Sequence, residues 1–163
     1  MSLLSFCQWL QGTDVSTAIR EGALYYPVIG GIHLLSIALF GGMILATDLR
    51  LLGWGLQRYP VSDVLTQLRP WKWAGFIVVS VSGLLLTWSE PIKLYHSKSF
   101  WTKMCLIMLV GFHALVYRRD VYDNAAALDK MTVMPKKATR AAGLSLILWA
   151  VIVFAGRMIA FDQ

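Results

Sequence analysis

The stretch YYPVIGGIHLLSIALFGGMIL, residues 25–45, is long and apolar enough to cross a membrane as one helix, since a span needs roughly 20 consecutive, mostly apolar residues. It contains one ionisable side chain, His33, between glycine pairs at positions 30–31 and 41–42. An ionisable residue inside a membrane helix is costly, so it indicates a functional site whose partner has to be sought elsewhere in the chain.

Three further segments have the same character: WAGFIVVSVSGLLLTW (73–88), FWTKMCLIMLVGFHALVY (100–117) and GLSLILWAVIVFAGRMIAF (143–161). Tryptophans near their ends, such as Trp71, Trp88 and Trp101, are typical of the membrane–water interface. Together the segments predict an all-α membrane protein, a single-domain bundle of four transmembrane helices over residues 25–47, 72–89, 95–118 and 141–161. In the first long connection, Ser62 is expected to cap a short helix that Pro70 ends.

Composition and charge narrow the class further. The chain has 163 residues, of which 57% are hydrophobic, and a formal net charge of +6. Lys and Arg gather in the first and third connections, which the positive-inside rule assigns to the cytoplasm. Both termini are then predicted on the outer, periplasmic side of a bacterial inner membrane, with residues 2–12 as an interfacial helix. The charge thus has a topological explanation that does not involve nucleic acid, and the two cysteines form no CxxC motif.

His96 is the predicted partner of His33. Pro27 and Pro91 each suit the first turn of a helix, which places the two histidines roughly 9 and 7.5 Å into helices that both start on the outer side. Two imidazoles at matching depth on facing helices of a four-helix bundle are one way to bind a b-type haem.

Three other residues fit such a site. Gly30, one turn before His33, leaves room for a flat macrocycle, and Lys103 and Arg157 offer positive charge to haem propionates. Each has an alternative explanation, because paired glycines often pack membrane helices together and long basic side chains often extend toward the headgroups.

His113 and Met43, at similar depth near the cytoplasmic side, are the less favoured metal ligands and would define a second, His–Met haem. The simpler interpretation is that His113 is a buried hydrogen-bonding residue or packs near Tyr117. No Asp or Glu falls in the central part of a predicted span, which argues against a proton relay.

Copper is the rival metal, because His33, His96 and some of the seven methionines could bind Cu(I) through soft ligands. The chain lacks a clustered methionine or histidine motif, however, and Met104 and Met108 are more simply explained as flexible packing residues.

The runs IHLLSIALFGGMILATDLRLLG (32–53), EPIKLYH (90–96) and FWTKMCLIMLVGFHALVYRR (100–119) resemble an uncharacterised family of bacterial four-helix membrane proteins with a domain of unknown function. The resemblance extends over residues 25–161. The architecture is also similar to small four-helix b-type cytochromes and, more loosely, to the membrane domain of copper-resistance proteins. Small b-type cytochromes pair histidines across helices, which here implies His33 and His96 and a single haem, since a diheme member needs four ligands.

These observations predict a membrane b-type cytochrome with one bis-His haem. It would transfer electrons between a quinone and an outer-side redox partner, such as a periplasmic cytochrome or a dehydrogenase subunit. No residue set suggests catalysis, so any enzymatic activity is expected to belong to a larger complex. Membrane lipid is an expected partner, and so is an oligomer or such a larger complex. Copper handling and a cofactor-free structural or anchor subunit are the alternatives.

Overall fold

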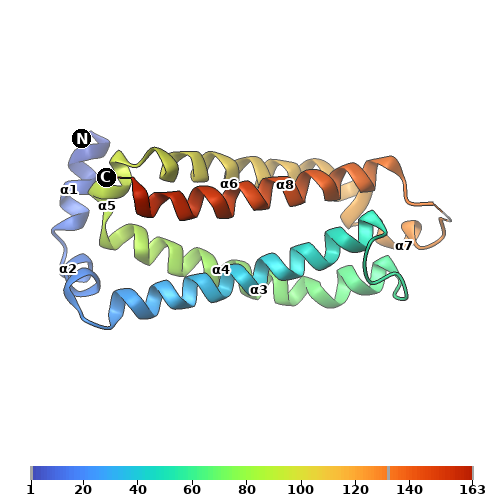
Figure 1. Cartoon of the computed structure of the whole chain (residues 1–163), viewed down its shortest axis with the longest axis horizontal. Coiled ribbons are helices and arrows are strands. Elements are labelled where there is room, and N and C mark those ends of the chain that lie inside the picture. The colour runs from blue at the N-terminus through green and yellow to red at the C-terminus, as the bar shows by residue number, and fades with distance from the viewer. Residues whose placement is uncertain (1, 132, 163) are drawn as a thin grey trace.

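The computed structural model of the chain describes residues 2–131 and 133–162 (Figure 1). Every regular element in these residues is a helix, which confirms the all-α prediction. In chain order they are α1 (Leu3–Gln11), α2 (Asp14–Glu21), α3 (Tyr25–Leu52), α4 (Val61–Ser89), α5 (Pro91–His96), α6 (Lys98–Tyr117), the π-helical turn η1 (Arg118–Tyr122), α7 (Ala125–Leu128), α8 (Lys136–Met158) and the 3₁₀ turn η2 (Ile159–Phe161).

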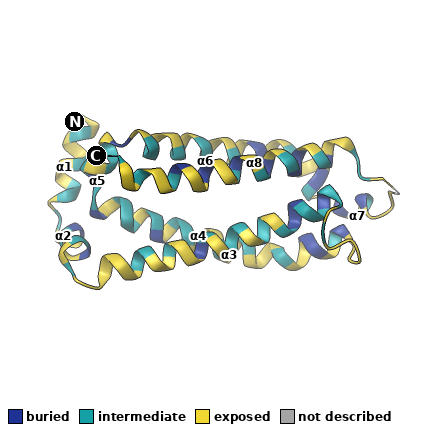
Figure 2. Ribbon diagram, viewed as in Figure 1, coloured by how far each residue is buried: buried dark blue, intermediate teal, exposed yellow. Residues whose placement is uncertain are grey.

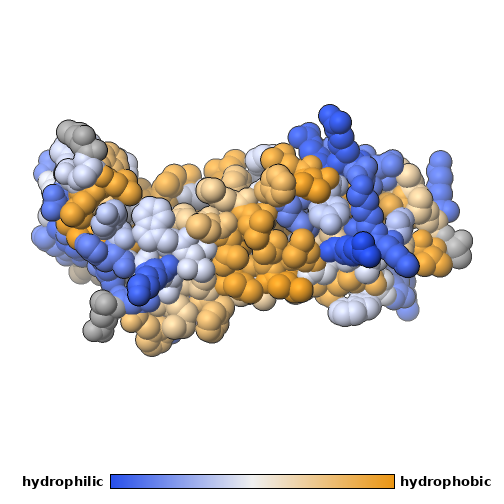
Figure 3. Space-filling view, turned by 90° about the horizontal axis from the view of Figure 1, so that it is seen from above, coloured by the Kyte–Doolittle hydropathy of each residue, from blue (hydrophilic) through white to orange (hydrophobic). Residues whose placement is uncertain are grey.

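Four helical stretches are long and apolar enough to cross a membrane: α3, α4, α6 continued by η1, and α8 continued by η2. They run side by side along the long axis of the molecule (Figure 1). On the face seen in Figure 3, an apolar surface covers the middle of the molecule, and hydrophilic side chains gather toward the two ends. The chain is therefore a multi-pass membrane protein with four transmembrane helices, as the sequence predicts.

The four long helices form two pairs, with α3 packed on α4 and α6 packed on α8. Contact between α3 and α8 joins the pairs (Figure 1). In the described part of the chain, α4 does not pack closely on α6 or α8. Each helix therefore has a distinct set of neighbours, and α3 is the helix that contacts both α4 and α8.

The two ends of the bundle differ in what closes them. One end, called the terminal end, holds α1, α2, α5 and η2, and the other, called the loop end, holds α7 and the connection between α3 and α4 (Figure 1). The predicted N-terminal helix is present as α1, which exposes Phe6 and Trp9 as an interfacial helix would. Both ends of the chain therefore meet at the terminal end.

Tight packing is concentrated at the loop end (Figure 2). A cluster of buried residues there joins α3, α4, η1, α7 and α8: Leu51, Val61, Leu65, Val121, Ala125, Leu128, Ala138, Ala141 and Ala142. Three alanines on α8 allow that helix to approach its neighbours closely, as small residues do in membrane bundles.

Pro70 lies inside α4 and does not end a separate helix, so that expectation was wrong. The side chain of Ser62 does not cap the helix either. Instead, the carboxylate of Asp129 accepts hydrogen bonds from the backbone N–H groups of Val61 and Ser62. Desolvation alone would raise the pKa of Asp129, but these hydrogen bonds outweigh it and hold the pKa below its usual value. The cap comes from far along the chain, where no local sequence pattern reveals it.

The third membrane helix begins at Lys98 and not near Pro91. Pro91 starts the separate six-residue helix α5, which His96 ends. Ser97 is extended, and its side chain caps α6 by accepting a hydrogen bond from the Phe100 N–H at 3.0 Å. His96 therefore precedes the membrane helix, whereas the sequence placed it five residues inside.

Candidate functional site

His33 of α3 is held against α4 by a hydrogen bond between its Nδ1 and Oγ of Ser82, 2.9 Å apart. The single hydroxyl hydrogen of Ser82 is donated to the carbonyl oxygen of Val78 at 2.6 Å. Oγ of Ser82 must then accept from Nδ1–H of His33. This network assigns the Nδ1–H tautomer to the neutral ring and leaves the lone pair of Nε2 free, since Nε2 makes no hydrogen bond within the described residues.

Lys103 of α6 shares this region of the bundle. Its aliphatic chain and ammonium lie against Gly156 of α8, where an added Cβ would be 3.5 Å from Nζ. Its positive charge is close enough to the His33 ring to interact with it electrostatically. Among the described residues no carboxylate oxygen lies within 4.0 Å of Nζ. Lys103 therefore packs against α8.

Gly83 makes the contact with His33 possible, because a Cβ added there would lie only 3.0 Å from Cε1 of the ring. A Cβ on Gly156 would meet Lys103 at an ordinary van der Waals distance. We call His33, Ser82, Gly83, Lys103 and Gly156 the histidine site; its members come from all four membrane helices. Ser82, Gly83 and Gly156 were missed in the sequence, because small residues are common in membrane helices and only the fold shows which of them face an ionisable side chain.

The surroundings of Gly30 and of Arg157 differ from those of the histidine site. A Cβ on Gly30 would meet no atom within 4 Å, and the same holds for Gly31, Gly41 and Gly42, so these pairs are not packing surfaces within the described chain. Arg157 is exposed, with its guanidinium carbon 6.0 Å from the centre of the Phe161 ring. That position agrees with the alternative in which Arg157 extends away from the bundle.

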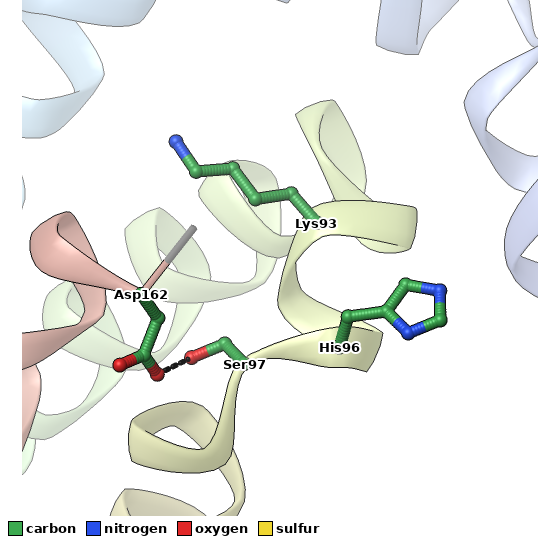
Figure 4. Close-up of a pocket in the computed structure, with 4 residues that line it drawn as sticks. All are labelled: Lys93, His96, Ser97 and Asp162. Carbon is green, nitrogen blue, oxygen red and sulfur yellow. Dashed lines mark hydrogen bonds between the residues drawn. The ribbon is translucent and has the colours of Figure 1, made fainter.

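His96 lies at the terminal end, apart from the contacts that hold His33. It is exposed and lines a surface pocket of about 290 Å³ with Lys93, Ser97 and Asp162. Its ring points to the opposite side from Asp162 (Figure 4) and stacks edge-on against Tyr95, with ring centres 5.0 Å apart. No contact in the described residues brings His96 to His33.

Asp162 closes the same end by capping α6. Its carboxylate accepts hydrogen bonds from Oγ of Ser97 at 2.6 Å (Figure 4) and from the N–H and Oγ of Ser99 at 2.8 and 3.1 Å. The hydrogen bond from Ser97, followed by those from Ser99, holds the pKa of Asp162 below its usual value. The C-terminal segment is thereby fastened to the start of α6.

His113 is a buried hydrogen-bonding residue, as its simpler interpretation holds. Nε2 lies 3.1 Å from the carbonyl oxygen of Ala141 and must donate to it, and the ring packs on Tyr117 with centres 4.8 Å apart. Met43 lies instead against Gly75 of α4. In the described part of the chain, no three His, Cys, Asp or Glu side chains gather at metal-binding spacing.

The histidine site offers one free imidazole nitrogen and one ammonium without an acidic partner, inside a membrane bundle. This set fits a haem in two respects, because Nε2 can bind iron and the ammonium can pair with a propionate. His96 does not fit as the opposite axial ligand in this arrangement.

Fold and site together define a multi-pass four-helix membrane protein with an ionisable site inside its bundle. The chain belongs to a family of unknown function, DUF6644, whose model matches residues 8–162 and so includes all four membrane helices. No curated protein and no solved structure matches it. Membership confirms the resemblance to an uncharacterised family, whereas the likeness to b-type cytochromes stays a prediction.

Proposed function

We propose that this protein is an electron-transfer subunit of the bacterial inner membrane that binds one haem b through Nε2 of His33. The hydrogen bond between Nδ1 of His33 and Ser82 is the observation that supports this most directly. Histidines that bind metals almost always donate their other ring N–H to an oxygen acceptor, which fixes the tautomer and the orientation of the ring. In this protein, Ser82 would be that acceptor.

Lys103 supplies the second element of the proposal. An ammonium inside a membrane bundle needs an anionic partner, and the described residues provide none within ion-pair distance. A haem propionate would be that partner. The position of Lys103 against Gly156 keeps its charge near His33.

A bound haem would supply one-electron redox chemistry. The chain's own residues then set how readily the electron is accepted: Ser82 orients the imidazole, the surrounding helices exclude water, and the positive charge of Lys103 favours the more negative, reduced state. The proposed exchange is between a quinone in the lipid and a redox partner at the terminal end, such as a periplasmic cytochrome or a dehydrogenase subunit. The gathering of Lys and Arg in the two long connections supports a cytoplasmic loop end.

The test is a dithionite-reduced minus oxidised absorption spectrum of the full chain, purified in detergent from cells well supplied with haem. Wild type is compared with His33→Ala and with His113→Ala, a matched control that removes another membrane-segment imidazole. We expect the absorption of bound haem, including a Soret band that shifts on reduction, in wild type and His113→Ala and its loss in His33→Ala.

His96→Ala separates the present proposal from the bis-His arrangement. Because the proposal rests on His33 alone, the Soret band of bound haem should survive this substitution. Loss of the band in His96→Ala would mean that α5 rearranges to bring His96 to the iron. A colourless wild-type protein would overturn the haem proposal and leave copper handling or a structural role.

A further inference from the structure

Asp48 of α3 is the one buried carboxyl group among the nine acidic residues of the chain. Only 1% of its surface is exposed, and its Oδ2 has no hydrogen-bond partner in the described residues. Asp48 lies in the last two turns of α3, beyond the end that the sequence analysis gave to the first span. The sequence analysis considered carboxyl groups only in the central part of each span, and Asp48 lies outside that part.

The neighbours of Asp48 come from three other elements. Lys72 of α4 and Ser145 of α8 lie beside the carboxyl group, and Tyr122 of η1 faces it as well. Lys72 forms no ion pair with Asp48. Its Nζ instead donates a hydrogen bond of 3.2 Å to Oγ1 of Thr47. Thr47 is the residue before Asp48 in the chain.

This arrangement suits a neutral carboxylic acid better than a carboxylate. A buried charge that is neither paired nor fully hydrogen-bonded costs several kcal/mol, and Oδ2 of Asp48 is unpartnered. Ionisation would be compensated if Lys72 moved from Thr47 to the adjacent carboxylate. The flexible four-carbon side chain of a lysine allows such a shift without movement of the helices.

We propose that Asp48 is a reversible proton-binding site at the loop end of the bundle, with Lys72 as its movable counter-charge. When the proton is bound, Lys72 donates to Thr47, as in the structure. When the proton leaves, Lys72 pairs with the carboxylate, so the site takes up and releases one proton with little net change in structure.

The other titratable groups around the site are basic or phenolic. Arg69 lies near Lys72 on the same helix and interacts with it electrostatically. Tyr117 interacts in the same way with Tyr122. His113 is engaged in its hydrogen bond with the carbonyl oxygen of Ala141. Asp48 is thus the only buried acid in the described residues that can exchange a proton at this end. The inference does not depend on haem, because none of these residues belongs to the histidine site.

Infrared spectroscopy of the full chain in lipid nanodiscs tests the proposal. Exposed carboxyl groups are ionised at about pH 6, since their ordinary pKa is about 4, so a carboxylic acid band that remains there reports a buried acid. We expect such a band in wild type, a shift of it in D₂O and its loss on alkaline titration. It should be absent in Asp48→Asn and present in Asp120→Asn, a control with an exposed carboxylate.

Lys72→Gln provides a second test that leaves Asp48 in place, in case Asp48→Asn fails to fold. The substitution removes the counter-charge of ionised Asp48, so the carboxylic acid band should persist to higher pH than in wild type. Absence of the band from wild type at about pH 6, or an unchanged titration in Lys72→Gln, would overturn the proposal. Loss of the wild-type band on replacing choline chloride with sodium chloride at fixed pH would assign a sodium site instead.

Discussion

Gly83 of α4 leaves the space that the imidazole of His33 fills, and a Cβ atom placed on Gly83 would lie 3.0 Å from Cε1 of that ring. Few real Cβ contacts are so short, so a methyl group there must displace the ring. The position of His33 is therefore set from two sides, by the absent side chain of Gly83 and by the hydroxyl of the preceding Ser82.

Gly83→Ala is expected to disturb the histidine site, because the added methyl pushes the His33 ring away from α4. Overpacking of this kind typically costs about 1–3 kcal/mol. Haem content and thermal stability of the purified protein should both fall. Gly41→Ala is the matched control, since a Cβ on Gly41 meets no atom within 4 Å; an equal loss in both variants would show that the contact with His33 is not the cause.

Ser82→Ala removes the acceptor for Nδ1–H of His33. Loss of the hydrogen bond is expected to cost about 1 kcal/mol of stability and to weaken haem retention about 10- to 100-fold, as second-shell changes at metal sites do. Haem retention in the presence of an apo-protein acceptor measures this. Ser80→Ala, on the same helix, should behave like wild type, and a Ser82→Ala variant with wild-type retention would contradict the assigned role.

Asp162 should make the stability of the terminal end depend on pH. Its pKa is lower in the folded protein than in the unfolded chain, because Ser97 and Ser99 donate to the carboxylate. Its contribution is therefore present above the ordinary carboxyl pKa and is lost as the pH falls through the lower folded value. The protection of amides at the start of α6, taken relative to their intrinsic exchange rate at each pH, should fall in acid in wild type. In Asp162→Asn this protection should already be lower at neutral pH and change less in acid; identical profiles would contradict this.

Asp129→Ala is expected to destabilise the loop end by about 1 kcal/mol, the usual cost of losing a helix N-cap. The substitution leaves the N–H groups of Val61 and Ser62 without their acceptor. Thermal unfolding in detergent measures the effect. Asp129→Asn should retain most of the stability, because Asn caps helices about as well as Asp, and a similar loss in both variants would indicate that charge rather than capping is responsible.

The sequence alone was sufficient to predict the four membrane helices, since length and apolar composition are local properties that the bilayer requires. It also singled out His33, because an imidazole in an otherwise apolar run is conspicuous. The partners of His33 could not be predicted from the sequence, because they are inconspicuous. Ser82 and Gly83 are ordinary residues of a membrane helix, and only the packing of α3 on α4 brings them to the ring.

His96 shows why a depth argument can fail. Counting residues from Pro91 assumes one continuous helix, whereas the extended Ser97 separates α5 from α6. Asp48 shows the converse error, because α3 continues to Leu52 and the first span was ended too early. Both errors concern where a helix ends, which depends on capping contacts such as that of Asp162 with Ser97.

The central claim, that Nε2 of His33 binds the haem iron, is tested most directly by chemical rescue. His33→Gly removes the ligand and leaves a space that free imidazole can fill. The measurement is the haem content per chain of purified His33→Gly with and without imidazole, beside wild type. We predict one haem per wild-type chain, none in the variant alone, and recovery of the wild-type spectrum with imidazole. Wild-type haem content in His33→Gly without imidazole would contradict the claim.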